Sequence, residues 1–306
     1  MIEATVIIAT RDRADFLRDC LACLARQTAR GRFDVIVVDN GSTDSTPAVI
    51  AGAAAASNGS VRGLSVAEAN RGKARNAGLA AAAGRIIIFC DDDTLPPEQF
   101  VEAHLAAHVS AASGRTSNAL ESVVTGPIVN VTDARSLPAP GPGNFSRAFF
   151  CTCNVSAPKR ALEKIGGFDE RYDLYGWEDT DVGVRLRATG LKRTFAWDAY
   201  IYHVKPPESL PLDRALSLAR EKGAMAARFV RKSPTIAVKL ATGAYGANYL
   251  RVAVVHAAPM RSLYARWARE RPPASRLARF AREALVDAAY IDSLRSAMRR
   301  RNIRED

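Results

Sequence analysis

The first 95 residues alternate short apolar runs with segments of helical periodicity, and this alternation limits the possible fold more than any other feature. Strands are predicted at residues 4–10, 34–38, 62–66 and 85–90, where β-branched and other apolar residues follow one another. Helices are predicted between them, at residues 13–27, 46–56 and 74–83. Such alternation is typical of a parallel, doubly wound α/β sheet with helices on both faces. The sequence has neither a Gly-x-Gly-x-x-Gly fingerprint nor a P-loop, which argues against a dehydrogenase and an ordinary NTPase.

Beyond Pro97 the alternation becomes less regular. We expect a helix at 98–112, a strand at 122–131, a Pro- and Gly-rich flap at 137–144, a strand at 148–156, a helix between Pro158 and Gly166, a helix at 177–189 and a last strand at 192–203. From about residue 210 the chain is predicted to be helical and basic.

Three consecutive aspartates, Asp91, Asp92 and Asp93, directly follow the fourth predicted strand. Carboxylates that lie this close at the end of a buried strand repel one another unless a positive group neutralises them. A divalent cation is the natural candidate, because open α/β sheets bind their ligands at the carboxyl ends of the strands. A solvated acidic turn is the alternative. The position favours a metal or phosphate site.

Composition restricts the partners and the compartment. The chain has 306 residues, a formal net charge of +11 and a pI of about 9.7, which favours anionic partners such as nucleotides, phosphorylated lipids, nucleic acid or a membrane surface. Its five cysteines show no zinc-site spacing and suggest a reducing compartment. The N-terminus lacks the pattern of a signal peptide, and the most apolar segment, 235–255, is interrupted by charged and amide residues. We therefore expect a cytoplasmic protein.

Several short motifs occur in a fixed order along the first 205 residues: IATRDR at 8–13, VDNGSTD at 38–44, NRGKARNAG at 70–78, FCDDD at 89–93, GGFDE at 166–170, WEDTD at 177–181 and YH at 202–203. Together they resemble the motifs of the family 2 glycosyltransferases. The resemblance implies a GT-A fold, a Rossmann-like, mostly parallel sheet flanked by helices, here with a C-terminal helical appendage. It also implies a GT-A catalytic domain at 1–207, with a nucleotide-binding half at 1–95 and an acceptor-binding half at 96–207, and a basic helical extension at 208–306.

The resemblance places a nucleotide-sugar donor at the ends of the first strands. A carboxylate at Asp39 can accept the imide N–H of uracil, whereas cytosine lacks that donor. Asp39 is thus the expected base reader, although it could instead cap the turn that follows it. Lys73 and Arg75 would lie beside the diphosphate, or form a solvated helix face. The donor-binding residues implied by the resemblance are Ala9, Thr10, Arg13, Asp39, Lys73, Asp91 and Asp92.

The same resemblance implies a Mn²⁺ or Mg²⁺ ion bound by Asp93 and His203. The cation would neutralise the charge that develops on the departing nucleoside diphosphate. All-oxygen ligation suits Mg²⁺, and an imidazole ligand favours Mn²⁺. The alternative for His203 is a packed core histidine.

Asp179 is the expected catalytic base, and Glu178 would orient the acceptor or support Asp179. Attack of a hydroxyl on an anomeric carbon needs a base on the face opposite the leaving group. A predicted helix N-terminus at this pair favours the ionised carboxylate, although a simple N-terminal preference for acids is the alternative. The acceptor-binding residues implied by the resemblance are Gly167, Phe168, Asp169 and Trp177.

Two features leave parts of this prediction open. Arg11 stands where the family usually has an aromatic residue, and Ala9 where it has a proline, so the identity of the base is undecided. The arginine-rich extension suits either an anionic membrane surface or a helical cap on the catalytic domain, and no motif supports nucleic-acid binding.

The predicted function is an inverting, metal-dependent glycosyltransferase of cell-surface polysaccharide or glycoconjugate synthesis. It would move a sugar, with UDP as the preferred carrier, to a hydroxyl of a glycan or lipid-linked acceptor, in the cytoplasm or at the inner face of the membrane. The alternatives are a catalytically inactive nucleotide-sugar-binding protein of the same fold and a nucleotidyltransferase. A nucleotidyltransferase would need a Gly-rich phosphate loop after the first strand, and the sequence has none.

Overall fold

The computed structural model describes residues 1–113, 122–205 and 210–300. The chain divides into two compact units, one formed by Met1–Arg171 with Glu178–Pro207 and the other by Tyr172–Trp177 with Glu208–Asp306. The predicted domain boundary at 207/208 lies outside the described residues. None of the described helices is both long and apolar enough to cross a membrane.

The elements of the first unit follow the predicted alternation closely as far as residue 95. In chain order they are β1 (Ala4–Thr10), α1 (Ala14–Leu24), β2 (Phe33–Asp39), α2 (Thr46–Ala56), β3 (Val61–Ser65), α3 (Arg71–Ala81), β4 (Ile86–Cys90), β5 (Thr94–Leu95), α4 (Phe100–Ser113), β6 (Ser122–Thr125), β7 (Ile128–Val131), the 3₁₀ turn η1 (Pro142–Asn144), β8 (Asn154–Pro158), α5 (Lys159–Lys164), α6 (Glu178–Ala188), β9 (Lys192–Phe195) and β10 (Ile201–Val204).

Within the described residues, seven strands form the main sheet in the order β3-β2-β1-β4-β8-β6-β9. Strand β8 is antiparallel to both of its neighbours, and the other pairs are parallel. Strands β5, β10 and β7 form a second, small sheet. The predicted fold class, a mostly parallel α/β sheet flanked by helices, is confirmed.

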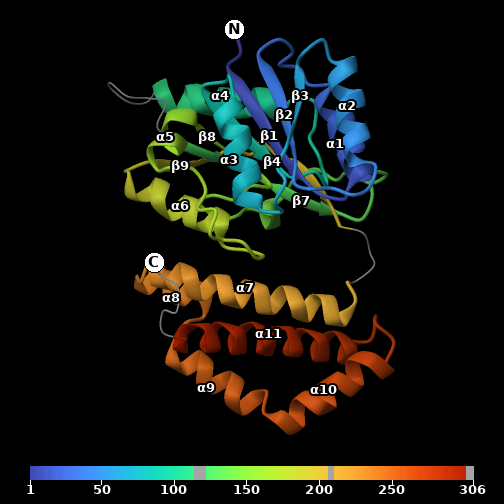
Figure 1. Cartoon of the computed structure of the whole chain (residues 1–306), viewed down its shortest axis with the longest axis vertical. Coiled ribbons are helices and arrows are strands. Elements are labelled where there is room, and N and C mark those ends of the chain that lie inside the picture. Colours follow the sequence, from blue (N-terminus) through green and yellow to red (C-terminus); the bar gives the residue numbers. More distant parts are fainter. Residues whose placement is uncertain (114–121, 206–209, 301–306) are drawn as a thin grey trace. The chain divides into compact units, whose positions relative to one another are not determined.

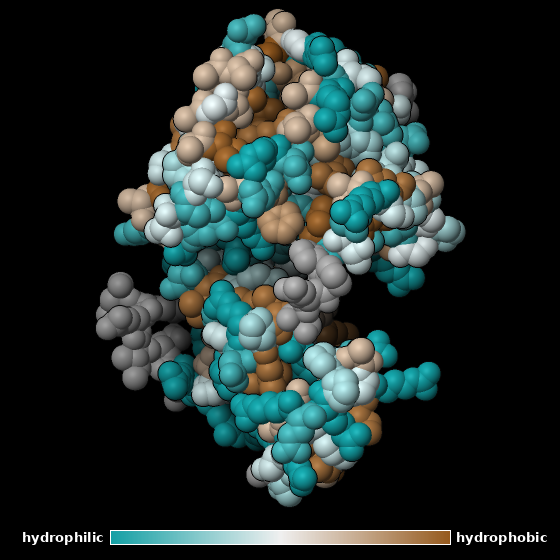
Figure 2. All heavy atoms as spheres, turned by 90° about the vertical axis from the view of Figure 1, so that its right-hand side faces the viewer, coloured by the Kyte–Doolittle hydropathy of each residue, from teal (hydrophilic) through white to brown (hydrophobic). Residues whose placement is uncertain are grey.

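Helices cover both faces of the main sheet (Figure 1). Because side chains alternate along a strand, Val6 and Ile8 of β1 pack with α1, α2 and α4. Ile7 points to the opposite face and packs with α3, α5 and α6. On the face drawn in Figure 2, apolar residues gather in patches between hydrophilic ones, and α1 and α2 border an apolar hollow of about 780 Å³ there.

Two strands predicted as continuous are each divided between the two sheets. The predicted strand 122–131 is β6 and β7, which separate at Gly126 and Pro127 because Pro127 has no N–H to donate to a ladder. The predicted strand 192–203 is β9 and β10, which separate on either side of Ala199. The two bends touch: a Cβ on Gly126 would lie 1.8 Å from the carbonyl oxygen of Ala199, so only glycine fits.

Other predicted boundaries are also corrected. The strand expected at 148–156 begins at Asn154, and the helix expected at 177–189 begins at Glu178, because Trp177 has a φ of +74° that an α-helix does not accept. The expected flap at 137–144 ends in the single turn η1.

Asn154 connects the two bends through its side-chain amide. Its Nδ2 donates to the carbonyl oxygens of Pro127 (3.0 Å) and Ala199 (2.8 Å). Because both N–H groups are used in this way, its Oδ1 must accept, and His104 Nε2 lies 3.0 Å away as the donor. One buried amide therefore holds both of these bends together.

The same hydrogen-bond chain continues to a second buried histidine. Since Nε2 of neutral His104 carries the proton, Nδ1 accepts from Ser156 Oγ (2.9 Å), and Ser156 Oγ accepts from His108 Nε2 (2.8 Å). Burial lowers the pKa of His104 to about 4 and that of His108 to about 3. Both imidazoles are therefore neutral at physiological pH.

The second unit consists mainly of helices, as predicted for the extension. They are α7 (Leu212–Lys232), α8 (Ile236–Thr242), α9 (Gly246–Val255), α10 (Ala258–Glu270) and α11 (Arg276–Arg299). Helices α7 and α11 run side by side in the same direction, since Arg282 donates to the carbonyl of Leu210 and Ser293 to that of Arg220. A Cβ on Gly223 would lie 2.3 Å from the carbonyl oxygen of Tyr290, so glycine permits this close approach.

Candidate active site

The acidic triplet lies where the carboxyl ends of β1, β2 and β4 meet. Thr10 of β1 pairs with Asp39 of β2, and Asp91 follows the last residue of β4. Thr10 Oγ1 donates to Asp92 Oδ2 at 2.7 Å. The structure therefore brings together the predicted donor-side residues of three different motifs at the edge where open α/β sheets bind ligands.

Asp39 is buried and accepts a hydrogen bond from the backbone N–H of Ser42 (2.9 Å) through Oδ1. This is the turn-capping contact that the sequence left open as the alternative to base reading. Oδ2 accepts no hydrogen bond from the described residues, so one oxygen is available to a ligand. The role of Asp39 toward a base stays a prediction, as does that of the neighbouring Ala9.

Arg13, predicted on the donor side, also pairs with two of the aspartates, which its motif does not indicate. Its Nη1 lies 3.2 Å from Asp92 Oδ1 and also contacts Asp93 Oδ2. Burial opposes the charge of Arg13, but the two carboxylates together raise its pKa. Burial raises the pKa of Asp92 to about 6, against the effects of Arg13 and Thr10. An arginine thus relieves part of the repulsion for which a divalent cation was predicted.

Arg75 neutralises the third aspartate and connects it to the predicted catalytic pair. Its guanidinium lies 3.5 Å from Asp91 and 3.1 Å from Glu178, and it is 6% exposed. The guanidinium also lies over the ring of Phe168, at 5.5 Å. Although burial opposes its charge, the surrounding carboxylates raise its pKa, Glu178 most strongly. The sequence indicated only a general phosphate-side charge for Arg75, because the contact with Glu178 is not visible in either motif.

Asp179 is half-buried at the start of α6. Its Oδ1 accepts from the N–H (2.6 Å) and the hydroxyl (3.2 Å) of Thr180. Burial raises its pKa to about 6, the charge of Glu178 adds to this, and Arg75 opposes it. The helix N-terminus was expected to favour the ionised form, and burial outweighs that effect. At pH 7 a carboxyl group with this pKa is ionised and remains a usable base.

His203 and Asp93 meet through the second sheet. Strand β10 pairs with β5, which places His203 opposite Thr94, and Nε2 lies 3.3 Å from Asp93 Oδ1. Burial tends to raise the pKa of Asp93, but His203 and Arg13 lower it overall. Asp93 Oδ1 is buried and accepts no conventional hydrogen bond among the described residues, so it is available for another partner.

The spacing of this pair can be compared with that of two metal ligands. Neighbouring ligand atoms of an octahedral cation bound at about 2.1 Å lie about 3 Å apart, close to the 3.3 Å between Nε2 and Oδ1. Among the residues that the structure describes, no group of three His, Cys, Asp or Glu side chains converges to hold a metal. The residues present therefore fit a cation that takes its remaining ligands from a bound donor or water.

Lys73 pairs with an acidic residue outside the triplet. Its ammonium group forms an ion pair with Glu68, and its backbone N–H is capped by the side chain of Asn70 (3.0 Å) at the start of α3. Both charged groups of this pair are exposed or half-exposed. The donor role of Lys73 stays a prediction that its contacts do not test.

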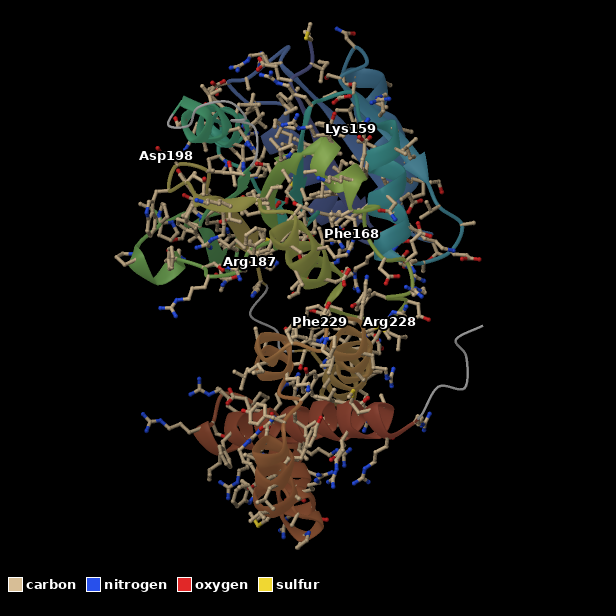
Figure 3. All side chains as sticks on the ribbon, turned by 90° about the vertical axis from the view of Figure 1, so that its left-hand side faces the viewer. Lys159, Phe168, Arg187, Asp198, Arg228 and Phe229 are labelled. Atoms are coloured by element: carbon tan, nitrogen blue, oxygen red, sulfur yellow. The ribbon has the colours of Figure 1, made fainter. Side chains whose placement is uncertain are left out.

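The predicted acceptor residues 167–169 form a turn fixed by Asn76. Asn76 donates to the carbonyl of Phe168 (2.9 Å) and accepts from its N–H (2.8 Å), and a Cβ on Gly167 would lie 2.5 Å from Asn76 Oδ1. The ring of Phe168, labelled in Figure 3, is 2% exposed. It packs against the ring of Phe89, with the ring centres 5.4 Å apart. Asp169 accepts from the N–H of Arg171. The side chain of Phe168 therefore belongs to the core, and a role of residues 167–169 toward an acceptor stays a prediction.

Trp177 belongs by its contacts to the second unit. Its ring stacks on Phe229 (5.7 Å), and its Nε1 donates to the carbonyl of Lys222 (3.1 Å). The ammonium group of Lys222 lies 5.6 Å from the ring centre. A role of Trp177 toward an acceptor remains a prediction.

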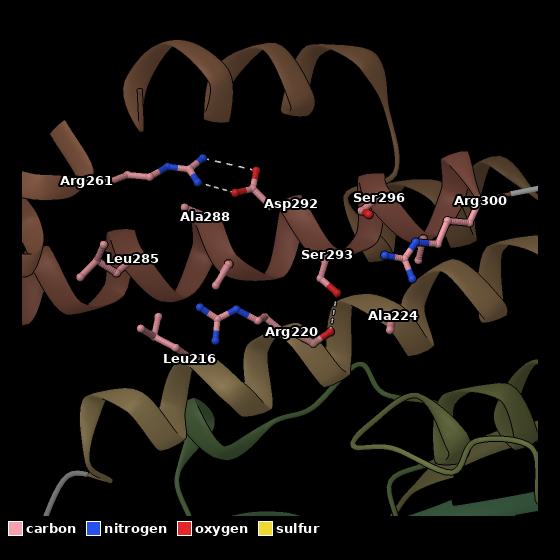
Figure 4. A pocket seen from close by; sticks show the side chains of 12 residues that line it. Leu216, Arg220, Ala224, Arg261, Leu285, Ala288, Asp292, Ser293, Ser296 and Arg300 are labelled. Carbon is pink, nitrogen blue, oxygen red and sulfur yellow. Dashed lines mark hydrogen bonds and ion pairs between the residues drawn. The ribbon is translucent and has the colours of Figure 1, made fainter. Parts of the chain in front are cut away.

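The second unit contains a separate hollow of about 470 Å³ between α7 and α11. Its floor is apolar, and the guanidinium groups of Arg220 and Arg300 lie along it (Figure 4). Arg261 also lines it but is paired with Asp292. Its lining shares no residue with the acidic site of the first unit.

Two family models match successive parts of the chain. Residues 5–114 match glycosyl transferase family 2, and residues 134–206 match the N-terminal domain of galactosyltransferase. Validoxylamine A glucosyltransferase of Streptomyces hygroscopicus subsp. jinggangensis (strain 5008) is 30% identical over 274 residues, covering 77% of this chain and 62% of that protein. The chain thus spans less than two thirds of that relative's length.

Solved structures share the fold at low sequence identity. The mannosyltransferase PcManGT from Pyrobaculum calidifontis, in complex with GDP-Man and Mn²⁺, has a TM-score of 0.61 at 18% identity, covering 98% of this chain and 88% of that one. S. aureus TarS 1-349, in complex with UDP-GlcNAc, has a TM-score of 0.56 at 16% identity, covering 100% of this chain and 94% of that one. The chain therefore shares the GT-A fold of these structures, and residues 5–114, which carry the donor-side motifs, belong to glycosyl transferase family 2.

Proposed function

We propose that this protein is an inverting glycosyltransferase that moves a sugar from a nucleoside-diphosphate donor to a hydroxyl group of a glycan or lipid-linked acceptor. One observation carries the proposal: Arg75 joins Asp91 of the donor-side triplet to Glu178, the neighbour of Asp179. This ion-pair bridge supports the proposal, because a single displacement requires a donor and a base in one site. Residues 1–207 would form the catalytic domain and 208–306 the extension.

In the proposed reaction Asp179 takes the proton of the acceptor hydroxyl. The acceptor oxygen then forms a bond to the anomeric carbon from the face opposite the leaving group. The bond from that carbon to the phosphate oxygen breaks, and the electron pair leaves with the nucleoside diphosphate. Attack from the opposite face inverts the anomeric centre. General-base catalysis of this kind contributes about 10²–10⁴-fold to the rate.

The chain's own residues would position the donor. UDP is the preferred carrier in this proposal, because Asp39 can accept the N–H of uracil through its free oxygen. Asp93 and His203 would hold a Mn²⁺ or Mg²⁺ ion, which stabilises negative charge on the leaving diphosphate when bound. The Mn²⁺ in the PcManGT complex and the UDP-GlcNAc in the TarS complex support this choice of ligands.

The test combines donor binding with product stereochemistry. The melting temperature of the protein is measured with UDP-, GDP- and dTDP-sugars, each with and without Mn²⁺. The true donor should raise it, because a ligand that binds the folded state stabilises that state. NMR of the transferred sugar should show inversion, and retention would contradict the mechanism. Asp179→Asn should abolish transfer and keep the donor-induced shift, whereas a protein that only binds nucleotide sugars would transfer nothing even before mutation.

We also propose that the extension contacts an anionic membrane surface at the inner face of the membrane. Residues 208–306 contain 20 of the 43 Lys and Arg residues of the chain and 9 of its 32 Asp and Glu residues. The extension therefore carries the whole formal charge of +11. Exposed apolar residues such as Leu277 and Phe280 lie among its arginines. Basic helices with exposed apolar side chains bind anionic bilayers.

A further inference from the structure

Three aromatic rings form an exposed cluster on the first unit, outside the acidic site. Phe195 is the last residue of β9, Trp197 lies two residues after it, and Phe145 follows η1. The ring centres of Phe145 and Phe195 are 4.8 Å apart, and those of Phe195 and Trp197 are 5.0 Å apart. Phe145 is 46% exposed and Trp197 is 45% exposed. Apolar rings of this size are normally buried, so a grouped exposure suggests a binding surface.

The sheet topology places this cluster on the same edge as the acidic triplet. Strand β9 is parallel to β6, and β6 and β4 are both antiparallel to β8, so β9 and β4 end at the same edge. They are three strand spacings apart, or about 14 Å at about 4.8 Å per spacing. The cluster therefore lies on the same edge of the sheet as the acidic triplet, about three strand spacings away from it.

Arg193 fixes the cluster from within. Its guanidinium lies 5.5 Å from the ring centre of Phe145 and 5.7 Å from that of Phe195. It also donates to the carbonyls of Ser146 and Ala148, on the chain that follows Phe145. The loop that carries Phe145 is thereby tied to the edge strand. Rings held in this way lose little conformational entropy when a ligand binds.

Polar groups at the cluster identify the ligand class. Among the described residues, neither Nε1 of Trp197 nor the carboxylate of Asp198 has a hydrogen-bonding partner, and Asp198 lies at the periphery of the unit (Figure 3). A pyranose ring presents an apolar C–H face bordered by hydroxyls, which matches an aromatic surface bordered by a donor and an acceptor. A sugar hydroxyl can donate to the carboxylate of Asp198, whereas an acyl chain would leave that carboxylate without a partner.

We infer that Phe145, Phe195 and Trp197 form a subsite that binds a sugar ring of the acceptor, several residues away from the hydroxyl that receives the transferred sugar. This inference rests on the proposed function and narrows the class of acceptor. An acceptor that reaches both sites must be an oligosaccharide or a longer glycan. A monosaccharide acceptor would occupy only the neighbourhood of Asp179.

The experiment uses the full-length chain on an array of neutral and acidic oligosaccharides of graded length. The wild-type protein should bind a set of glycans, with affinity that rises with chain length. Trp197→Ala should weaken that binding about tenfold or more, which corresponds to about 1.4 kcal/mol, and Phe145→Ala should act in the same direction. Leu137→Ala, a substitution of another exposed apolar residue at 44% exposure, is the matched control and should bind as the wild type does.

Donor binding measured on the same samples separates this inference from the proposed function. A UDP-sugar should stabilise Trp197→Ala as much as the wild type. If no donor raises the melting temperature of the wild-type protein, the proposed function is contradicted. Absence of glycan binding by the wild type, or equal binding by Trp197→Ala, would overturn the aromatic subsite while leaving donor binding intact.

Discussion

Arg75 and Glu178 lie 103 residues apart in the chain, and Nη1 of the arginine is 3.1 Å from Oε1 of the glutamate. The pair is buried, so each charge depends on the other for its stabilisation. Asp179, next to Glu178, is held at a pKa of about 6 by burial and by Glu178, with Arg75 acting in the opposite direction. The ion pair therefore controls the protonation of the proposed base.

Substitution of Arg75 should move the acid limb of the pH-rate profile. Because Asp179 must be ionised to accept a proton, kcat should rise as the pH passes through about 6 and level off above it. Arg75→Gln removes the positive charge, so the limb should move up by about one pH unit or more, while Arg75→Lys should keep it near the original position. Circular dichroism checks that both variants fold. An unmoved limb in folded Arg75→Gln would refute the coupling.

Asp93→Ala should weaken donor binding only when Mn²⁺ is present. The proposed cation site contains Asp93 Oδ1 and His203 Nε2, 3.3 Å apart, and loss of one ligand reduces metal affinity. Calorimetric titration with UDP should show a Mn²⁺-dependent gain in affinity for the wild type that is lost in the variant. Asp15→Ala, an exposed acidic residue of α1, is the control. If Asp93→Ala keeps the full gain, Asp93 is not a metal ligand.

His104 and His108 should make the fold sensitive to acid. Both are neutral in the folded and the unfolded chain above pH 6.5, the ordinary pKa of histidine, and add no pH dependence there. As the pH falls from 6.5 toward 4, the unfolded chain takes up protons that folded His104 does not, so stability is lost. A pKa lowered from 6.5 to about 4 corresponds to a loss of about 3 kcal/mol at pH 4.

The comparison that isolates this effect is wild type against His108→Gln. Asp92 and Asp179, with pKa values raised to about 6, act in the opposite direction over the same range, but they are present in both proteins. Chemical denaturation at pH 7.5 and pH 5 should show a larger loss for the wild type than for the variant. Equal losses of unfolding free energy in the two proteins would mean that protonation of His108 in the unfolded chain does not contribute to the acid sensitivity.

Charge reversal on α11 should reduce membrane binding. Arg276 and Arg279 are exposed and lie on either side of the exposed Leu277. A basic residue near an anionic surface contributes about 1 kcal/mol, so Arg276→Glu with Arg279→Glu should lower the affinity for phosphatidylserine vesicles at least about tenfold in a sedimentation assay. Arg18→Glu on α1 is the control. Identical binding by the double variant would favour the helical-cap interpretation of the extension.

The sequence predicts the first half of the fold well because its signals are local there. Four apolar runs and the helices between them follow from residue periodicity, and the carboxyl ends of parallel strands necessarily meet at one edge. The juxtaposition of Thr10, Asp39 and the triplet follows from that rule. The resemblance to a family adds Asp179, and it adds His203, which no local pattern would have placed near Asp93.

The rest depends on contacts that no motif encodes. The division of β6 from β7 and of β9 from β10 results from the close approach of Gly126 to Ala199, and each strand alone reads as continuous. Arg13 and Arg75 neutralise the aspartates because of where α1 and α3 begin relative to β4, which periodicity does not specify. The aromatic cluster joins residues about fifty positions apart, so no local pattern around Phe145 predicts its contact with Phe195.

The amide of Asn154 has a consequence for how tightly the active site is specified. By donating to the carbonyls of Pro127 and Ala199 it fixes the point from which β10 continues to His203. These hydrogen bonds hold the imidazole of His203 next to Asp93 without the help of a ligand. A donor can then bind without a rearrangement of His203 and Asp93. The selectivity for donors depends on how far the buried side chain of Asn154 can be displaced.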